Sequence, residues 1–431
     1  MPLETLLAKL DSFAVGREMH SFASLLYPWC RSITGDGFRD TLYAVIKRIP
    51  IELHEVPSGT QVFDWTIPDE WNIRDAFIKN DHGERVVDFR NHNLHVVNYS
   101  VPVDRRMSLA ELRLHLHSIP EKPDWIPYRT TYYKKAWGFC LSHRQLTALP
   151  NGEYHVVIDS TLKPGHLTYG ELFLPGQMED EVLISVHCCH PSLANDNLSG
   201  IVVATRLAQE LRRIDLRYSY RFLFVPGTIG SITWLSRNEK IATRIAHGLV
   251  LTCLGDPGGF TYKKSRRGDA EIDRAAAQVL RWSKEPHRIV DFVPYGYDER
   301  QYCSPGFNLP IGCFMRSPHG EFPEYHTSGD DLDFVQPEAL GDSLVKLLQI
   351  IDVLEGNYRY VSLNPKGEPQ LGRRGLYGAI GEQVMAMLWT LNLADGSHSL
   401  LDIAERSNIP FSTLKTAASK LREQQLVATI A

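Results

Sequence analysis

The chain has 431 residues, of which 43% are hydrophobic and 23% charged, and its formal net charge is −5. This is the composition of an ordinary globular protein of two or three domains, and the charge gives no reason to expect a nucleic acid or an anionic membrane as partner. No run approaches the roughly 20 apolar residues that span a bilayer, and the start, MPLETLLAKLDSF, lacks the apolar core of a signal peptide. Seven cysteines without framework spacing fit reduced thiols, so we predict a cytoplasmic protein.

The predicted elements change character along the chain. Residues 1–50 contain three amphipathic helical runs. Residues 61–150 are rich in aromatic residues and proline and alternate over short runs, which predicts a β-rich module with one helix at 108–119. From residue 152 strand and helix patterns alternate, as in a mostly parallel sheet covered by helices, and the tail from about residue 372 has an all-helical pattern. We therefore predict an α/β domain (1–60 and 151–370), an inserted β-rich domain (61–150) and a small C-terminal domain (371–431).

The stretch HCCHPSLANDNLSG (187–200) lies between a predicted strand and a predicted helix. Pro191 favours an extended residue before it and a break after it, which places His190 at the carboxyl end of the strand and Asp196 in the following loop. Ligands bind at this edge of open α/β sheets, and an imidazole with a carboxylate suits zinc or a similar divalent ion. Taken alone, capping of the helix by Asp196 or Asn197 explains the loop better.

Two later stretches carry the same residue types. LVLTCLGDPGG (249–259) ends a predicted strand with Asp256, and PHGEFPEYHTSGDD (318–331) places His326 among further acids. A metal site assembled from distant segments needs several clusters of this kind, so the three stretches together favour such a site over a helix cap.

The order of these motifs resembles that of zinc-dependent aminopeptidases and glutamate-carboxypeptidase-like exopeptidases. More closely, GTQVFDWTIPDEW, WGFC, CHPSLANDNLSG, VPGTIGSITWL and EYHTSGDDLDF resemble a bacterial family of aminopeptidase-like proteins, often associated with surface-polysaccharide gene clusters. The resemblance covers nearly the whole chain. It implies a zinc-exopeptidase-like sheet sandwiched by helices, an inserted domain and a winged-helix-like C-terminal domain.

Carried over by position, the resemblance implies one zinc ion, with room for a second. Cys188 and Cys189 match no ligand and are expected to be buried packing residues, and His187 also matches no ligand. The implied metal ligands are His190, Asp196 as the carboxylate that bridges two metals, Asp256 and His326.

One stretch departs from the family pattern. Zinc aminopeptidases carry a Glu-Glu pair where this chain has FLFVPGTIGS (222–231), which contains no acid. A two-metal hydrolase needs carboxylates for both ions and a base for the attacking water. YGYDERQY supplies Asp298 and Glu299, and the candidate replacement bases are Glu299 and Glu324, although both are equally well explained as solvated loop carboxylates.

Two arginines and one loop complete the candidate site. Arg316 and Arg300 are candidates for holding a substrate carboxylate or an anionic sugar in bidentate fashion, although lone arginines are more often surface residues. The loop RSITGDGFR (31–39) either lines the entrance to the pocket or only joins two helices.

The leading hypothesis is a metal-dependent hydrolase of an amide or peptide bond, acting on a small peptide or an N-acylated small molecule, with a role in surface-polysaccharide metabolism. The alternative is a non-catalytic metal- or metabolite-binding protein or regulator that keeps the peptidase fold. We expect no nucleic-acid and no membrane partner, and a homo-oligomer is left open.

The tail, residues 376–431, resembles a winged helix whose recognition helix would be 410–425. From Gly375 onward there are four basic and five acidic residues, and no second strand follows LVATIA to form a wing. Binding of duplex DNA depends on Lys and Arg that neutralise several phosphates. We therefore predict that this domain docks against the catalytic domain or a second subunit and does not bind DNA.

Overall fold

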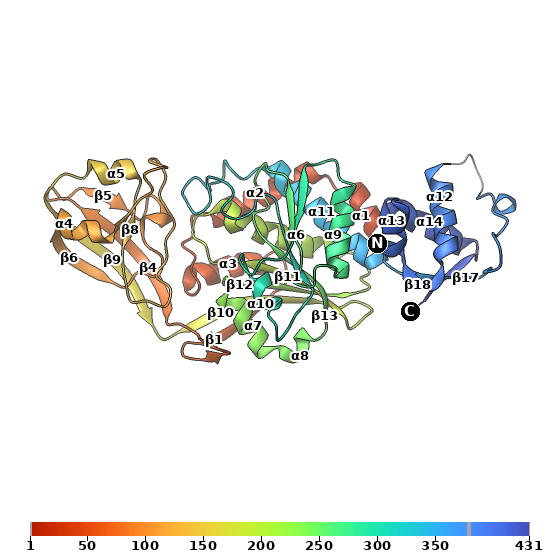
Figure 1. Cartoon of the computed structure of the whole chain (residues 1–431). Coiled ribbons are helices and arrows are strands. Elements are labelled where there is room, and N and C mark those ends of the chain that lie inside the picture. The colour runs from red at the N-terminus through yellow and green to blue at the C-terminus, as the bar shows by residue number, and fades with distance from the viewer. Residues whose placement is uncertain (1, 377–380, 431) are drawn as a thin grey trace.

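The computed structural model describes residues 2–376 and 381–430. Its centre is an eight-stranded sheet in the order β1-β10-β12-β11-β13-β16-β14-β15 (Figure 1). The four central strands β12, β11, β13 and β16 are mutually parallel, and β10 and β14 join them in antiparallel orientation. The predicted mostly parallel sheet is therefore confirmed. The strands are β1 (Glu52–Pro57), β10 (His166–Leu174), β11 (Glu181–His187), β12 (Ser219–Val225), β13 (Ile245–Leu251), β14 (Phe260–Lys263), β15 (His287–Val290) and β16 (Ile311–Met315).

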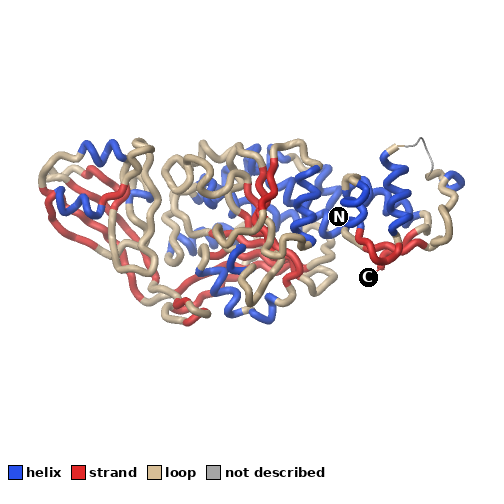
Figure 2. The backbone as a smooth tube through the Cα atoms, in the orientation of Figure 1, coloured by secondary structure: helices blue, strands red, loops and turns tan. Residues whose placement is uncertain are grey.

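Helices cover both faces of this sheet. On one face α11 packs against α2, α6 and α9 (Figures 1 and 2). The contact between α11 and α2 is so close that a Cβ on Gly16 would lie 2.0 Å from a backbone oxygen of α11, which only glycine permits. Within the described chain, no helix is long and apolar enough to cross a membrane. The helices of the domain are α1 (Leu3–Lys9), α2 (Ser12–Leu26), α3 (Asp36–Ile46), α6 (Gly200–Leu211), α7 (Ile229–Arg237), α8 (Glu239–Ala242), α9 (Glu271–Arg281), α10 (Glu299–Tyr302) and α11 (Pro337–Gly356).

The inserted module has its own four-stranded antiparallel sheet, in the order β5-β4-β9-β6, and its own hydrophobic core. We expected 153–163 to belong to the α/β domain, but this strand pairs with β4 and β6. Its residues alternate between buried and half-buried, which is typical of an antiparallel strand with one solvated face. The predicted helix at 108–119 is only one turn of α-helix followed by a 3₁₀ turn. The elements are β2 (Gln61–Val62), β3 (Trp65–Thr66), β4 (Glu70–Lys79), β5 (Arg85–Asp88), β6 (Val103–Ser108), α4 (Leu109–Leu112), β7 (Leu116–His117), β8 (Phe139–Cys140), α5 (His143–Ala148) and β9 (Glu153–Lys163).

In its described residues, the C-terminal domain contains three α-helices and a three-stranded sheet in the order β18-β17-β19. The expectation of an all-helical tail is wrong, because β18 and β19 lie within the tail and pair with β17, which lies upstream of residue 371. The domain therefore begins near residue 358. The predicted helix from 376 starts at Glu382, and residues 377–380 lie outside the described residues. The elements are β17 (Arg359–Ser362), α12 (Glu382–Leu393), β18 (Asp395–Ser399), α13 (Leu400–Ser407), α14 (Phe411–Glu423) and β19 (Val427–Ile430).

Ion pairs join this domain to the α/β domain. Arg274 on α9 pairs with Asp402 and Glu405 on α13, both at 2.6 Å. Lys415 on α14 pairs with Asp352 on α11 at 2.7 Å. The C-terminal domain thus packs on the face of the sheet that carries α9 and α11, as the first of the two predicted docking modes requires.

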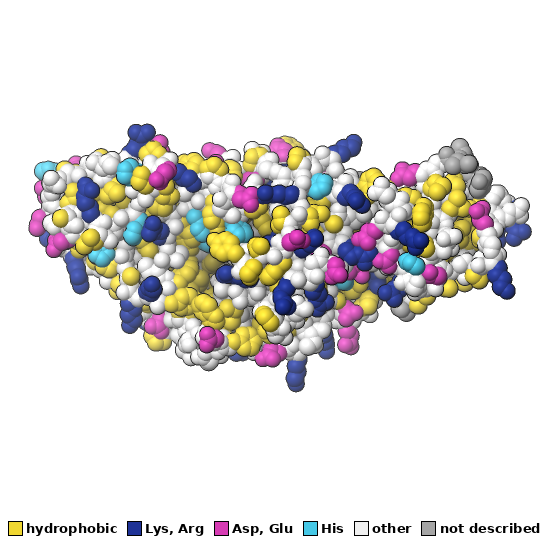
Figure 3. Space-filling model, viewed as in Figure 1, with side chains coloured by type: hydrophobic (Ala, Val, Ile, Leu, Met, Phe, Trp, Pro, Cys, Tyr) yellow, Lys and Arg dark blue, Asp and Glu magenta, His cyan; other side chains and the backbone are white. Residues whose placement is uncertain are grey.

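At the opposite end, hydrophobic side chains gather on the surface where the inserted module meets the central domain (Figure 3).

Candidate metal centre

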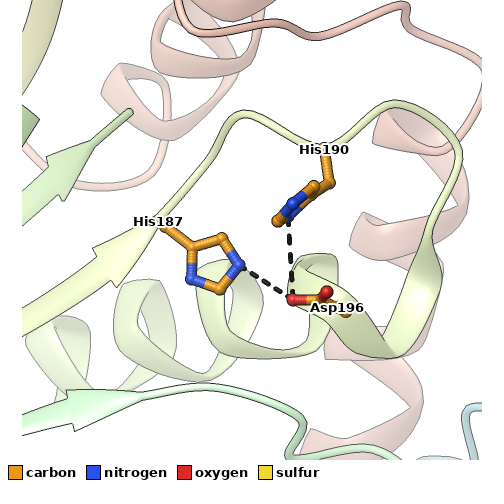
Figure 4. A group of neighbouring side chains, drawn as sticks. All are labelled: His187, His190 and Asp196. Atoms are coloured by element: carbon orange, nitrogen blue, oxygen red, sulfur yellow. Dashed lines mark hydrogen bonds and ion pairs between the residues drawn. The ribbon is translucent and has the colours of Figure 1, made fainter. Parts of the chain in front are cut away.

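Four side chains meet at the carboxyl end of β11. His187 is the last residue of that strand, and its Nε2 lies 2.9 Å from Oδ1 of Asp196. Nδ1 of His190 lies 3.7 Å from the same oxygen (Figure 4). Nε2 of His326, from a loop 130 residues downstream, lies 3.0 Å from Oδ2. The group therefore consists of three imidazoles around one carboxylate, and it includes His187, which the sequence comparison had excluded.

The loop that carries Asp196 is held by its neighbours. The carboxylate of Asp330 accepts hydrogen bonds from the backbone N–H groups of Asn195 at 2.5 Å and Asp196 at 3.0 Å. The side chain of Asn197, not that of Asp196, accepts the hydrogen bond from the N–H of Gly200 at the start of α6. Capping and the polar cluster thus use different residues, and the Asp196 carboxylate is left facing the histidines.

Asn197 also fixes the tautomer of His187. Its Oδ1 accepts from the N–H groups of Gly200 and Cys253, so its Nδ2 must be the atom that faces the carbonyl of Leu251 at 3.0 Å. The same Nδ2 lies 3.3 Å from Nδ1 of His187, which is therefore an acceptor. The ring proton is then on Nε2 and is donated to Asp196.

Aromatic rings enclose the three imidazoles. Tyr297 stacks on His187 with centroids 4.4 Å apart, and Tyr325 stacks on His326 at 3.9 Å. Burial lowers the pKa of His190 to about 3, so this ring is neutral. Its Nδ1 is buried and has no hydrogen-bond partner among the described residues, and the carboxylate oxygen of Asp196 lies 3.7 Å from it.

The loop 31–39 supports this centre from beneath. Arg31 is fully buried, and its Nε donates to the carbonyl of His190 at 2.8 Å. The next residue, Ser32, donates to Asn98 of the inserted module. The loop therefore braces His190 and the inserted module instead of lining an entrance.

Asp256 lies apart from the histidines. Its Oδ1 accepts from Ser317 Oγ at 2.6 Å and from the N–H of Gly258 at 2.8 Å, and its Oδ2 accepts from the side chain of Asn195 at 3.0 Å. The compact group of potential metal donors among the described residues consists of His187, His190 and Asp196, so neither Asp256 nor His326 belongs to it. Asp256 therefore connects its own loop to the loops of Ser317 and Asn195 by hydrogen bonds and does not face the histidines.

The two candidate bases differ in environment. Glu299 is fully buried and forms an ion pair with Lys263, which is 4% exposed. Glu324 is half-buried, and the hydrogen bonds at this residue are those that its backbone carbonyl accepts from Thr327. Neither glutamate belongs to the His/Asp group among the described residues.

The two candidate arginines also separate. Arg316 stacks over Phe260 and donates to the carbonyl of Gly258 at 2.9 Å, which gives it a packing role. Arg300 lies beside the end of β12, with Nη2 3.5 Å from Thr228 Oγ1 and a buried Nε that has no hydrogen-bond partner in the described part of the chain. Of the two, only Arg300 lies beside this strand end.

A carboxylate does stand at the end of β12, although the strand itself carries none. Oδ1 of Asp298 accepts from the N–H of Thr228 at 2.7 Å and from Ser231 Oγ at 2.9 Å. Its Oδ2 is buried and finds no hydrogen-bond partner within residues 2–376 and 381–430, and burial raises the pKa of this carboxyl group. Asp298 directly follows Tyr297, the residue that stacks on His187. The acid missing from 222–231 is thus supplied by another segment.

Comparisons with known proteins agree with this architecture. The family model described as a domain of unknown function (DUF4910) matches residues 20–357. The chain belongs to this family. A winged helix-turn-helix model matches residues 358–429 of this DUF4910 protein, so the winged-helix prediction for the tail is confirmed.

Relatives in Clostridium acetobutylicum span the full length of the chain. A protein named for polysaccharide biosynthesis and an aminopeptidase-like domain is 49% identical over 426 residues, which cover 97% of this chain and 98% of the relative. A crystal structure from the same organism, named as a peptidase, superposes with a TM-score of 0.96 at 48% identity and covers 99% of both chains.

More distant structures share the fold. The zinc aminopeptidase BSAP of Bacillus subtilis superposes with a TM-score of 0.55 at 14% identity, covering 78% of this chain and 94% of that one. A peptidase M28 precursor of Shewanella amazonensis gives 0.57 at 12% identity, covering 82% and 96%. The DUF4910 protein therefore has an aminopeptidase-like fold.

Proposed function

We propose that this protein is a metal-dependent hydrolase of an amide or peptide bond. The observation that carries the proposal is the convergence of His190, Asp196 and His326, with His187 behind them, at the carboxyl edge of a parallel sheet. Neutral imidazoles and one carboxylate form the donor set of catalytic zinc sites. The Nδ1 of His190, buried and without a hydrogen-bond partner among the described residues, fits this interpretation, because a buried polar atom without a partner is otherwise unfavourable.

The proposed ligands for one zinc ion are His190, Asp196 and His326. His187 would hold Asp196 in place through its Nε2–H, as partners of metal ligands commonly do. Bound zinc supplies Lewis acidity and lowers the pKa of water towards about 7. We propose one ion and not two, because Asp256 is occupied elsewhere and Asp196 is the one carboxylate in the group.

We further propose that Asp298 is the proton acceptor. A general base must be a carboxylate or imidazole with a free acceptor atom near the reacting water. Oδ2 of Asp298 is free, whereas Lys263 neutralises Glu299. The hydrogen bonds from Thr228 and Ser231 to Oδ1 hold the carboxylate in one orientation and leave Oδ2 to take the proton.

The substrate class and location follow as proposals. The name of the Clostridium relative, which joins polysaccharide biosynthesis to an aminopeptidase-like domain, supports a substrate from polysaccharide metabolism. Among such compounds, an N-acylated one contains the amide bond that the proposed hydrolase would cleave. All seven cysteines are unpaired, and six of them are buried, which supports a reducing cytoplasm.

A metal and turnover assay tests this function. Protein purified without chelator should carry about one equivalent of zinc by elemental analysis, as the donor count requires. It should then hydrolyse a member of a panel of aminoacyl-anilides and N-acylated amino sugars, and chelation should abolish the reaction. Metal binding with no turnover on either class would favour the alternative, a non-catalytic metal-binding regulator with the same fold.

We propose that the winged-helix domain is a packing domain without DNA-binding activity. With its start at residue 358, the domain contains eight basic and six acidic residues, so its net charge alone does not exclude DNA binding. The stronger support is that Lys415, on the would-be recognition helix, is paired with Asp352 and Glu4 of the α/β domain. Gel-shift titration of the full chain with mixed duplex DNA at about 50 mM salt should show no micromolar shift, and a salt-sensitive shift would contradict this proposal.

A further inference from the structure

Four aromatic side chains from three separate segments lie together at the surface. Phe63 and Trp65 belong to the β2–β3 hairpin, Tyr133 to a loop of the inserted module and Phe307 to the loop after α10. Phe63, Trp65 and Tyr133 are 47%, 38% and 50% exposed. Trp65 meets Tyr133 edge-on at 5.3 Å, and Phe63 meets Phe307 edge-on at 5.9 Å.

Two of these rings belong to residues with a strained backbone conformation. Phe63 has φ 52° and Tyr133 has φ 64°, a left-handed conformation that bulky residues rarely adopt. Neither ring gains burial from this strain, since both stay about half exposed. Strained backbone that presents an apolar group to solvent points to a binding role and not to packing.

The exposed rings continue inward to the metal centre. Tyr133 contacts Tyr132 at 6.5 Å between centroids, and the hydroxyl of Tyr132 lies 3.0 Å from that of Tyr128. Tyr128 is 8% exposed and meets both His190 and His326 edge-on at 5.1 Å. Exposure thus falls stepwise along one aromatic wall, from the surface to the proposed ligands.

Polar groups are interleaved with the rings. Gln61, Asp64 and Thr66 on the same hairpin are exposed. Phe63 also lines a cavity of about 440 Å³ whose other walls include Arg237 and Glu239. The surface is therefore a set of open ring faces with hydrogen-bonding groups between them, unlike the enclosed apolar pocket that would receive a hydrophobic amino-acid side chain.

We propose that Phe63, Trp65, Tyr133 and Phe307 form a saccharide-binding platform at the entrance to the metal centre. The C–H groups on one face of a pyranose match the negative face of an aromatic ring, while its hydroxyl rim needs polar partners of the kind found on this hairpin. The sugar of an N-acylated glycoside would rest on the platform and direct its amide along the tyrosine wall to the ligands. This inference rests on the proposed hydrolase function and names its substrate class.

Calorimetric titration of the zinc-loaded full chain tests the platform. The probes are N,N′-diacetylchitobiose, cellobiose and maltose, with the dipeptide amide Ala-Phe-NH₂ as the peptide arm. At least one disaccharide should bind saturably, and Trp65→Ala and Tyr133→Ala should each weaken it about tenfold, the loss expected for one stacked ring. The matched control is Trp282→Ala, because Trp282 is 44% exposed but lies on the far side, beside the winged-helix domain.

The outcomes separate the platform from the hydrolase. Zinc content is measured in every variant, and all of these surface variants should keep it. Wild type that lacks zinc overturns the proposed function, whereas zinc-loaded wild type that binds none of the three disaccharides overturns the platform. The platform is also overturned if Trp65→Ala loses dipeptide binding but keeps disaccharide binding. In that case the aromatic rings bind a peptide side chain and not a sugar.

Discussion

The carboxyl ends of β11 and β12 lie side by side, but their polar side chains come from different sources: a loop directly after β11 and a distant segment beside β12. The two strands are parallel neighbours, and His187 at the end of one is paired with Val225 at the end of the other. After β11, one short loop supplies a histidine and a carboxylate to the proposed metal site. After β12, the chain continues as Pro-Gly-Thr, and the acid beside it comes from Asp298, some 70 residues downstream. A strand end thus fixes where the chemistry is placed, but not which segment provides it.

The strongest test of the β11 end is removal of its carboxylate. Asp196→Asn keeps the size of the side chain but removes the charge that all three histidines face, and we expect zinc affinity to fall by more than about 100-fold. His326→Ala should do nearly the same. Zinc titration monitored by elemental analysis measures the change.

Asp256→Asn is the matched control, since Asp256 is also a buried aspartate in a loop that follows a strand of the central sheet. It should keep its zinc because its oxygens bond Ser317, Gly258 and Asn195. A folded Asp256→Asn protein without zinc would show that the ligand set carried over from the family is the correct one.

The test of the β12 end is Asp298→Asn. The amide keeps the shape but cannot take a proton, so turnover should fall by about 10²–10⁴-fold while bound zinc stays near the wild-type level. The rate is measured on whichever amide substrate the panel identifies. If turnover is unchanged in Asp298→Asn but is lost in Glu324→Gln, the general base is Glu324, in the loop that carries His326, and not Asp298.

Glu299→Gln separates a catalytic role from a structural one next to Asp298. Because it leaves the buried ammonium of Lys263 without its partner, we expect a loss of about 3–5 kcal/mol in the free energy of unfolding. Urea denaturation measures this loss. The double variant Glu299→Gln/Lys263→Met should recover much of it, and a stable but inactive Glu299→Gln protein would contradict the structural role.

The same contrast explains what could be predicted from the sequence. Continuous apolar runs such as EVLISV correctly predict buried parallel strands. When helices cover both faces of a sheet, both sets of side chains of a strand are buried, so the run carries apolar residues on both faces. The sequence prediction places residues 153–163 in the wrong sheet. Their buried and half-buried residues alternate, as in an antiparallel strand, but the strand–helix pattern that follows them favours the parallel sheet. Asp256 stands five residues beyond β13, where the direction of a side chain no longer follows from strand geometry.

Two members of the site gave weaker signals. The family resemblance gives His187 no ligand role. Its position as the last residue of a strand next to His190 nevertheless indicates that its side chain lies at the same edge of the sheet. The role proposed for Asp298 has no local signal in the sequence, because the hydrogen bonds of its carboxylate come from Thr228 and Ser231 in a distant segment. Contacts of this kind depend on how loops fold back over the sheet.

The smallest predicted effect concerns His187 and decides whether the β11 end supplies one histidine or two to the metal. The amide of Asn197 places the proton of His187 on Nε2, so His187 should orient Asp196 and not bind the ion. Glutamine carries an N–H donor near the position of Nε2. His187→Gln should therefore keep zinc affinity within a few-fold of wild type, whereas His187→Ala should lose about 10–100-fold. Equal losses in the two variants, measured by competition with a zinc chelator, would show that the ring nitrogen itself is a ligand and that β11 alone provides two of them.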